Sequence, residues 1–458
     1  MRRRYSFLLS FLLLLLLAGT FPIQGQNNTN LNWYFGSSDR GIRFNRGTHT
    51  VTLADNPAAS FGNGGGAVAS NPINGNLLFF TTDGSAIYDA TGAVMPNGSG
   101  LSGNPSGNQP AVIAAVPGQP NQYFVFTNTA DYTTGGDIFL TTVDMSLQGN
   151  GVPPAPNLGD VATSNVPIGT LTNRSEAMIL VPHANGTDYW LITHENATAN
   201  YSVTLIDASG AASNTNYQNV GFAMTAGNFA YNASSGQIAV SPQSANVGVH
   251  VLNFNNSTGM LSLDEVVPNS AVPATSNQAI YDVEWSSDGR YLYISVAGEP
   301  GIQGDVLQYD TQNPSATLTS VLPNGIANSY GLQMGPDSVI YHLYQETTGG
   351  PFLLGALSDT DTVATAVNYD PSVFSGDFGG TQFPSFLPSS SQTIMVDFTS
   401  SGSCANSPVS FFPEVDPAAD SLVWNFGDGT GSNQWSPKRT PHFHRMVAPP
   451  HPIPPAHA

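Results

Sequence analysis

Acidic residues fall at the starts of predicted strands, where they could share one site. Glu176 lies in the segment RSEAMIL, and Asp282 and Glu284 lie in YDVEW. Carboxylate oxygens are the ligands that calcium and other hard cations prefer. If these strands surround a common channel, Glu176 and Asp282 predict a structural calcium or a catalytic metal there. The alternative is a set of polar side chains beside buried water, and we expect this simpler arrangement.

A second candidate cluster contains His183, His194 and Glu195, at the two ends of the predicted strand from Tyr189 to Thr193. Two histidines and a glutamate can bind zinc. The sequence lacks the helical H-E-x-x-H spacing that would place both rings on one face. We therefore expect His183 and His194 to pack and to form hydrogen bonds around a hairpin rather than to bind metal.

Signatures of nucleophilic catalysis are missing from the sequence. There is no G-x-S-x-G motif, and Cys404 has no histidine nearby in the sequence, so we expect it to pack as a small core residue. The glycine-rich stretch NGGGAV at Asn63 lacks the Lys-Ser/Thr ending of a phosphate-binding loop and is predicted to be a flexible lead into a strand. These observations predict a protein without a cofactor that is not an enzyme.

Short β-rich runs separated by Gly, Pro, Asn and Asp make up most of the chain, as in YDVEWSSDGRYLYISV. The runs recur at about the spacing of propeller blades, roughly 40–50 residues with insertions. They begin near Gly66, Ala111, Ala177, Gly221, Tyr281, Tyr330 and Thr381. The pattern predicts an all-β protein with a β-propeller of about seven blades over residues 32–391. Six or eight blades, or a large β-sandwich assembly, are the alternatives.

The segment NWYFGSSDRGIRFN near the N-terminus could close this ring. We expect Trp33, Phe35 and Phe44 to lie in strands that join the last blade. Such closure ties the two ends of the ring together.

Residues 393–437 predict a second unit, because alternating strands precede the motif Trp424-Asn425-Phe426-Gly427-Asp428-Gly429. Trp424 and Phe426 are two apart, so both can fill the core of a sandwich. Gly427, Asp428 and Gly429 then form a sharp turn.

The composition changes at Lys438, the only lysine of the chain. Four of the nine histidines and five clustered prolines follow it. Residues 438–458 are therefore predicted to be disordered and out of frame, which would leave the second unit incomplete. The alternative is a natural Pro/His-rich tail.

These segments resemble a known family. The motif WNFGDG resembles the signature of a PKD domain, an immunoglobulin-like β-sandwich of extracellular proteins. The segments NWYFG at Asn32, NGNLLFFTTDGSAIYDATGAVMPNG at Asn74 and YFVFTNT at Tyr123 resemble the propeller region of secreted proteins of gliding bacteria. HANGTDYWLITHE, YDVEWSSDGRYLYIS and GLQMGPDSVIYHLY continue the likeness. The resemblance implies a propeller followed by a partial PKD domain, without the sorting domain that the type IX secretion system reads in that family.

The N-terminal sequence and the net charge predict the location of the protein. Arg2 to Arg4 precede an apolar stretch from Phe7 to Ala18, which is typical of a signal peptide over residues 1–25. The formal net charge of −20 disfavours binding to nucleic acid. We expect a secreted or cell-surface protein that is not integral to the membrane. The predicted function is a non-enzymatic adhesion platform for a glycan or protein. The alternative is a propeller hydrolase or lyase with a channel metal.

Overall fold

The computed structural model describes residues 28–38, 40–45, 50–55, 61, 64–244, 247–268, 279–315, 317–387, 395–401 and 410–416. One compact unit extends from Asn28 to Ser391. In the described part of the chain, strands dominate, and the short 3-10 helix η2 (Ala364–Ala366) follows β26. No helix of these residues is long and apolar enough to cross a bilayer.

Six four-stranded antiparallel sheets follow one another along this unit, each an up-and-down meander. The first two are β4 (Ala67–Ser70), β5 (Leu77–Thr81), β6 (Ala86–Asp89), β7 (Val94–Ser99) and β8 (Ala111–Ala115), β9 (Gln122–Asn128), β10 (Ile138–Asp144), β11 (Asp160–Pro167). The next two are β12 (Arg174–Pro182), β13 (Tyr189–Glu195), β14 (Asn200–Asp207), β15 (Gly210–Asn219) and β16 (Asn228–Asn232), β17 (Gln237–Ser241), β18 (Val249–Asn255), β19 (Met260–Val267). The last two are β20 (Ile280–Trp285), β21 (Tyr291–Val296), β22 (Asp305–Asp310), β23 (Thr319–Ser320) and β24 (Asn328–Met334), β25 (Ile340–Gln345), β26 (Leu353–Ser358), β27 (Asn368–Phe374).

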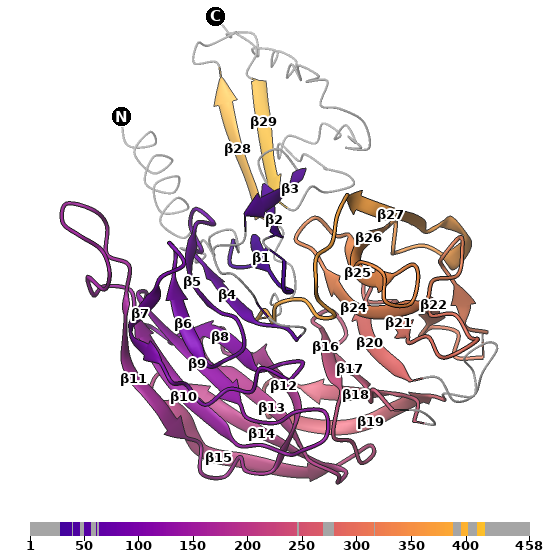
Figure 1. The fold of residues 1–458 in the computed structure, drawn as a ribbon, viewed down its shortest axis with the longest axis horizontal. Coiled ribbons are helices and arrows are strands. Elements are labelled where there is room, and N and C mark those ends of the chain that lie inside the picture. Colours follow the sequence, from indigo (N-terminus) through magenta and orange to yellow (C-terminus); the bar gives the residue numbers. More distant parts are fainter. Residues whose placement is uncertain are drawn as a thin grey trace, which may run out of the picture. The chain divides into compact units, whose positions relative to one another are not determined.

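The sheets are the blades of a β-propeller, and the first strand of each blade lies at the middle of the ring (Figure 1). The second strands are covered on both faces by neighbouring blades. For this reason the side chains of β21 and β25 are buried along their whole lengths. Apolar side chains of adjacent blades form shared clusters, such as the one that joins β17 and β18 to β20 and β21. The predicted all-β propeller of seven blades is confirmed.

The seventh blade is built from both ends of the unit. It contains the sheet β1 (Asn32–Tyr34), β2 (Arg40–Asn45) and β3 (Thr50–Asp55), and residues 378–386 pack on it. Trp33 is fully buried, with its ring centroid 5.3 Å from that of Phe383 and 5.5 Å from that of Tyr341 in β25. On the other side, Tyr34 packs against Phe80 in β5. The N-terminal segment therefore closes the ring, as its sequence predicts.

The second unit is described only through β28 (Met395–Ser401) and β29 (Ser410–Asp416), which form an antiparallel pair. The predicted PKD motif from Trp424 to Gly429, the signal peptide over 1–25 and the tail over 438–458 lie outside the described residues. The PKD domain, the export of the chain and its likeness to proteins of gliding bacteria stay predictions.

Candidate axial site

The first strands of the blades present polar side chains to the propeller axis. Tyr281 and Glu284 in β20 are deeply surrounded by protein, and burial is the main cause of their raised pKa values. Both side chains nevertheless keep some solvent-accessible surface. We therefore take the axis as the candidate site.

Glu176 is held at the axis by a break in the strand ladder. The pairing of β12 with β13 shifts in register between Arg174 and Met178, which releases Glu176 from the regular alternation. Its Oε2 accepts a hydrogen bond from the Asn108 backbone N–H at 3.0 Å, and its Oε1 accepts one from Asn108 Nδ2 at 2.9 Å. Asn108 Nδ2 also donates to Gln243 Oε1 at 2.7 Å, which fixes the orientation of the amide.

Burial changes the chemistry of the Glu176 carboxyl group. The side chain is 1% exposed, and desolvation raises its pKa from 4.5 to about 7, against the opposing effect of the Asn108 hydrogen bonds. A carboxyl group with such a pKa can take up or release a proton near neutral pH.

Asp282 and Glu284 connect two neighbouring blades. Asp282 Oδ2 accepts a hydrogen bond from the Leu332 N–H in β24 at 2.9 Å, and Glu284 Oε2 accepts one from the Met334 N–H at 2.8 Å. A register shift in β20 between Ile280 and Asp282 redirects the first carboxyl group. Burial raises the pKa of each carboxyl group to about 7. These two residues therefore have a structural role that their sequence does not reveal.

Tyr281 connects the acidic groups at the axis. Its pKa is raised, first by burial and then by the nearby charges of Asp282 and Glu176, while Thr381 and Gln382 lie close enough to its hydroxyl to oppose the shift. Glu176, Asp282 and Gln382 come from three different blades. The carboxyl groups of Glu176 and Asp282 are thus near enough to Tyr281 to raise the pKa of its hydroxyl.

Buried amide groups around this space lack hydrogen-bond partners among the described residues. They are both polar atoms of Asn228, Nε2 of Gln243 and Nε2 of Gln382. Asn228 is 2% exposed and lies close enough to Asp282 to lower the pKa of that carboxyl group, although no well-aligned hydrogen bond joins the two. Gln382 is 5% exposed. Unsatisfied buried polar groups cost about 1–3 kcal/mol each, so water or a polar ligand must satisfy them.

The glycine-rich stretch before β4 is not a flexible lead, which corrects the sequence-based prediction. Gly64 and Gly65 are buried, and the Gly65 N–H donates to the Asn108 carbonyl oxygen at 3.0 Å. A Cβ atom at Gly64 would lie 2.1 Å from the Gly107 carbonyl oxygen. These glycines allow the backbone to approach Asn108, the residue that orients Glu176.

The two histidines predicted as possible ligands do not form a metal site. His183 lies at a turn and stacks on Trp190 with ring centroids 5.1 Å apart. His194 is buried, its Nε2 bonds to the Phe222 carbonyl oxygen at 3.0 Å, and burial lowers its pKa to about 4. Across the described residues, no three His, Cys, Asp or Glu side chains are placed to hold a metal ion together. Glu176 and Asp282, by contrast, do converge on the axis.

A buried serine–histidine pair is also present in the last four-stranded blade. Ser329 Oγ lies 2.8 Å from His342 Nε2, and His342 Nδ1 lies 3.1 Å from the Tyr369 hydroxyl. Ser329 and His342 are both fully buried, and desolvation lowers the pKa of His342 to about 3. Both ring nitrogens of His342 are taken up by these two contacts, so we assign the pair a structural role in the blade.

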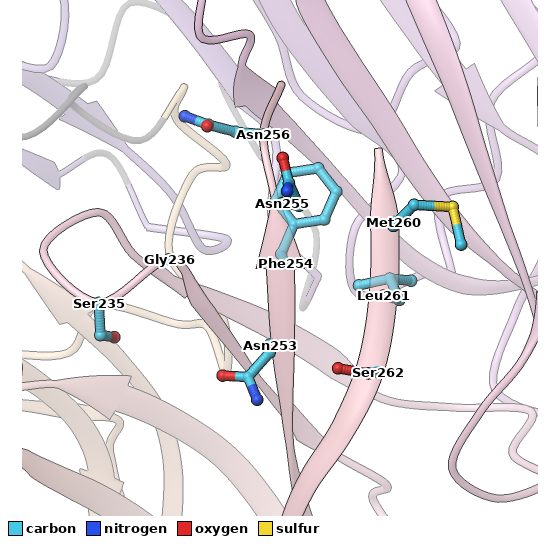
Figure 2. A pocket seen from close by; sticks show the side chains of 9 residues that line it. All are labelled: Ser235, Gly236, Asn253, Phe254, Asn255, Asn256, Met260, Leu261 and Ser262. Carbon is cyan, nitrogen blue, oxygen red and sulfur yellow. The ribbon is translucent and has the colours of Figure 1, made fainter. Parts of the chain in front are cut away.

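An open groove lies on the outer edge of the fourth four-stranded blade, between β18, β19 and the turn at Ser235 and Gly236 (Figure 2). Asn253 and Asn255 line it from β18, and Ser262 lines it from β19. No lining side chain is titratable. The groove can therefore bind a polar molecule, but it offers no acid or base for catalysis.

The acidic axis predicts a dependence of stability on pH. Because the pKa of Asp282 is raised in the folded state, its contribution to the free energy of unfolding is complete below about pH 4 and is lost as the pH rises through 7. We expect the unaltered protein to melt at a lower temperature at pH 8 than at pH 5. Asp282→Asn keeps an acceptor for Leu332 and should remove about 2–4 kcal/mol of this difference.

Melting curves at pH 5 and pH 8 test this prediction, with the exposed substitution Glu346→Gln as control. Asp131 and Asp144 do not contribute to a difference between pH 5 and pH 8. Hydrogen bonds lower their pKa values, so their effect on stability falls below about pH 4. An identical pH effect in Asp282→Asn and the unaltered protein would show that Asp282 does not contribute.

Comparisons with known proteins give likenesses of fold only. No protein-family model and no curated protein sequence matches the chain. A solved structure from Lactobacillus plantarum aligns with 78% of this chain and 99% of its own, at 12% identity and a TM-score of 0.44. A "putative 6-phosphogluconolactonase" of Bacteroides fragilis aligns with 78% of this chain and 97% of its own, at 12% identity and a TM-score of 0.46. The periplasmic gluconolactonase of Pseudomonas aeruginosa aligns with 70% of this chain and 84% of its own, at 14% identity and a TM-score of 0.34.

The prediction that the chain is not an enzyme is wrong. It rested on the absence of a local nucleophile motif, yet the similar folds include proteins named as gluconolactonases. A propeller can assemble acid and base groups from separate blades at its axis, and such groups leave no local sequence motif. Glu176 in β12 and Asp282 in β20 are acidic residues of separate blades, and both lie near Tyr281.

Proposed function

We propose that the protein is a hydrolase of small carboxylic esters, lactones included, whose reacting groups line the propeller axis. One observation carries the proposal. The Glu176 carboxyl group lies near the Tyr281 hydroxyl, and buried amide atoms of Asn228, Gln243 and Gln382 near these residues have no partner in the described part of the chain. A base, hydroxyl and amide donors and a partly dry environment are what hydrolysis of an ester needs.

Glu176 is the group best placed to act as the base. Water attacks the carbonyl carbon of the ester while the Glu176 carboxylate takes one of its protons. The tetrahedral intermediate then breaks its acyl carbon–oxygen bond, and Glu176 returns the proton to the leaving alkoxide oxygen. The products are a hydroxyl group and a carboxylic acid, so one carboxyl group serves both steps and is regenerated.

The neighbouring donors suit the charge that develops on the carbonyl oxygen. The Tyr281 hydroxyl is kept protonated because burial and acidic neighbours raise its pKa. Gln382 Nε2 has no hydrogen-bond partner in the described part of the structure. Hydrogen-bond donors that are already oriented in a site with little water stabilise an oxyanion more than donors in bulk water do.

Of the hydrolase and lyase that the sequence allows, we propose the hydrolase, because a carboxyl base beside hydroxyl and amide donors matches the needs of ester hydrolysis.

The pH dependence of turnover tests the proposal. Glu176 must be ionised to take the proton, and its pKa is about 7. We expect kcat/KM of EDTA-treated protein for neutral lactones and esters to rise about tenfold per pH unit below pH 6 and to level off above about pH 7. A plateau that begins below pH 5 would indicate an ordinary exposed carboxylate, and no turnover of any ester at any pH would end the proposal.

A further inference from the structure

The amide groups at the axis carry information about what the site binds. Asn228 and Gln382 are more than nine-tenths buried, and each has a side-chain polar atom without a partner in the described residues. Asn228 and Tyr281 share Ser241, whose Oγ accepts from the Asn228 N–H and donates to the Tyr281 carbonyl oxygen. Gln382 lies against Gly331, the residue before Leu332, which donates to Asp282, and against Gly65, which bonds to Asn108. They therefore face the same space from two different blades. An amide offers one donor group and one acceptor, which matches the hydroxyl group of a ligand.

The charges around the same space exclude anions. Three carboxyl groups lie at the axis, those of Glu176, Asp282 and Glu284. Arg174 precedes Glu176 by two residues, but its Nη1 donates to Ser202 Oγ at 2.6 Å and is not directed to the axis. The formal net charge of −20 adds a repulsive field for any anion that approaches.

We infer that the axial site selects uncharged, polyhydroxylated molecules and rejects their phosphorylated or carboxylated counterparts. This inference rests on the proposed function for the identity of the site, and it adds the class of substrate. Hydroxyl groups of the ligand take the positions of water on Asn228, Gln243 and Gln382. A phosphate group there would meet carboxylates and would find no guanidinium or ammonium partner among the described residues at the axis.

Calorimetry with an unreactive probe tests the selectivity without turnover. The probes are a sugar lactam, which resembles a lactone but resists hydrolysis, and the same lactam carrying a 6-phosphate. We expect the full-length protein at pH 7.5 to bind the neutral lactam at least tenfold more tightly than the phosphorylated one. Equal affinity, or tighter binding of the phosphorylated lactam, overturns the inference.

Two substitutions place the selectivity at the axis. Gln382→Lys supplies a cation, so it should reverse the preference and raise the affinity for the phosphorylated lactam at least tenfold. Asn228→Leu should weaken binding of the neutral lactam about tenfold, and this variant should still prefer the neutral lactam to the phosphorylated one. The matched control Gln119→Lys, at an exposed turn, should change neither affinity by more than twofold. If Gln119→Lys acts like Gln382→Lys, the effect is one of net charge and the inference fails.

The proposed hydrolase activity and the inferred selectivity for neutral ligands can be contradicted independently. If the neutral lactam binds selectively but no ester is hydrolysed, the proposed function is wrong and the selectivity of the axial site stands. If esters are hydrolysed but the phosphorylated lactam binds as well as the neutral one, the hydrolase stands and the inference on substrate class is wrong. Circular dichroism on Gln382→Lys confirms that the variant is folded, and the comparison in the unaltered protein needs no variant.

Discussion

Replacing Glu176 by glutamine should lower kcat/KM for a neutral ester by roughly 10²–10⁴-fold, the usual contribution of a general base. Glutamine has nearly the same shape, and its carbonyl oxygen can still accept the bond from Asn108 that Glu176 accepts. What it cannot do is take a proton from water. The loss should therefore fall on kcat, with KM changed less than threefold.

Two further variants separate catalysis from structure. Glu176→Asp keeps the charge but withdraws the carboxyl group by one methylene group, so an intermediate loss is expected. Glu346→Gln removes an exposed carboxyl group and should be silent. If Glu176→Gln retains more than a tenth of the turnover while remaining folded, Glu176 is not the base.

Replacing Trp33 by alanine should lower the free energy of unfolding by about 3–5 kcal/mol, the range for a buried aromatic residue. Trp33 is fully buried and lies 5.0 Å from Phe44, 5.5 Å from Tyr341 and 5.3 Å from Phe383, measured between ring centroids. These partners come from both ends of the ring. The variant should therefore weaken the whole propeller and not one blade.

Urea denaturation followed by circular dichroism measures this effect. The matched control is Tyr132→Ala, because Tyr132 is an aromatic residue that is 65% exposed, and its loss should cost less than about 0.5 kcal/mol. A single cooperative transition that moves to lower urea in Trp33→Ala supports closure by the N-terminal segment. An unchanged midpoint would mean that this segment does not hold the ring together.

The fold could be predicted because its signals are local. Five of the seven predicted blade starts, at Gly66, Ala111, Ala177, Tyr281 and Tyr330, fall on or within a few residues of the first strand of a blade. Gly221 and Thr381 are the exceptions, since β16 begins seven residues after Gly221, at Asn228, and no described strand begins near Thr381. Paired strands with aromatic and β-branched residues mark each hairpin in the sequence, and the turn residues separate the hairpins.

The candidate site could be predicted only in part. Glu176 and Asp282 stand out because acidic residues are few and both occur at strand starts. Asn108, Asn228 and Gln382 give no signal in a chain so rich in Asn, Ser and Thr. They meet only because closing the ring brings separate blades together, which is a consequence of topology that no local pattern records.

The position of a bound ligand tests the central claim most directly. A crystal structure with the neutral lactam should show it at the propeller axis, with hydrogen bonds to Glu176 and to the amides of Asn228 and Gln382. The alternative location is the outer groove between β18 and β19 (Figure 2). A lactam that is ordered in that groove while the axis holds only water would contradict the account.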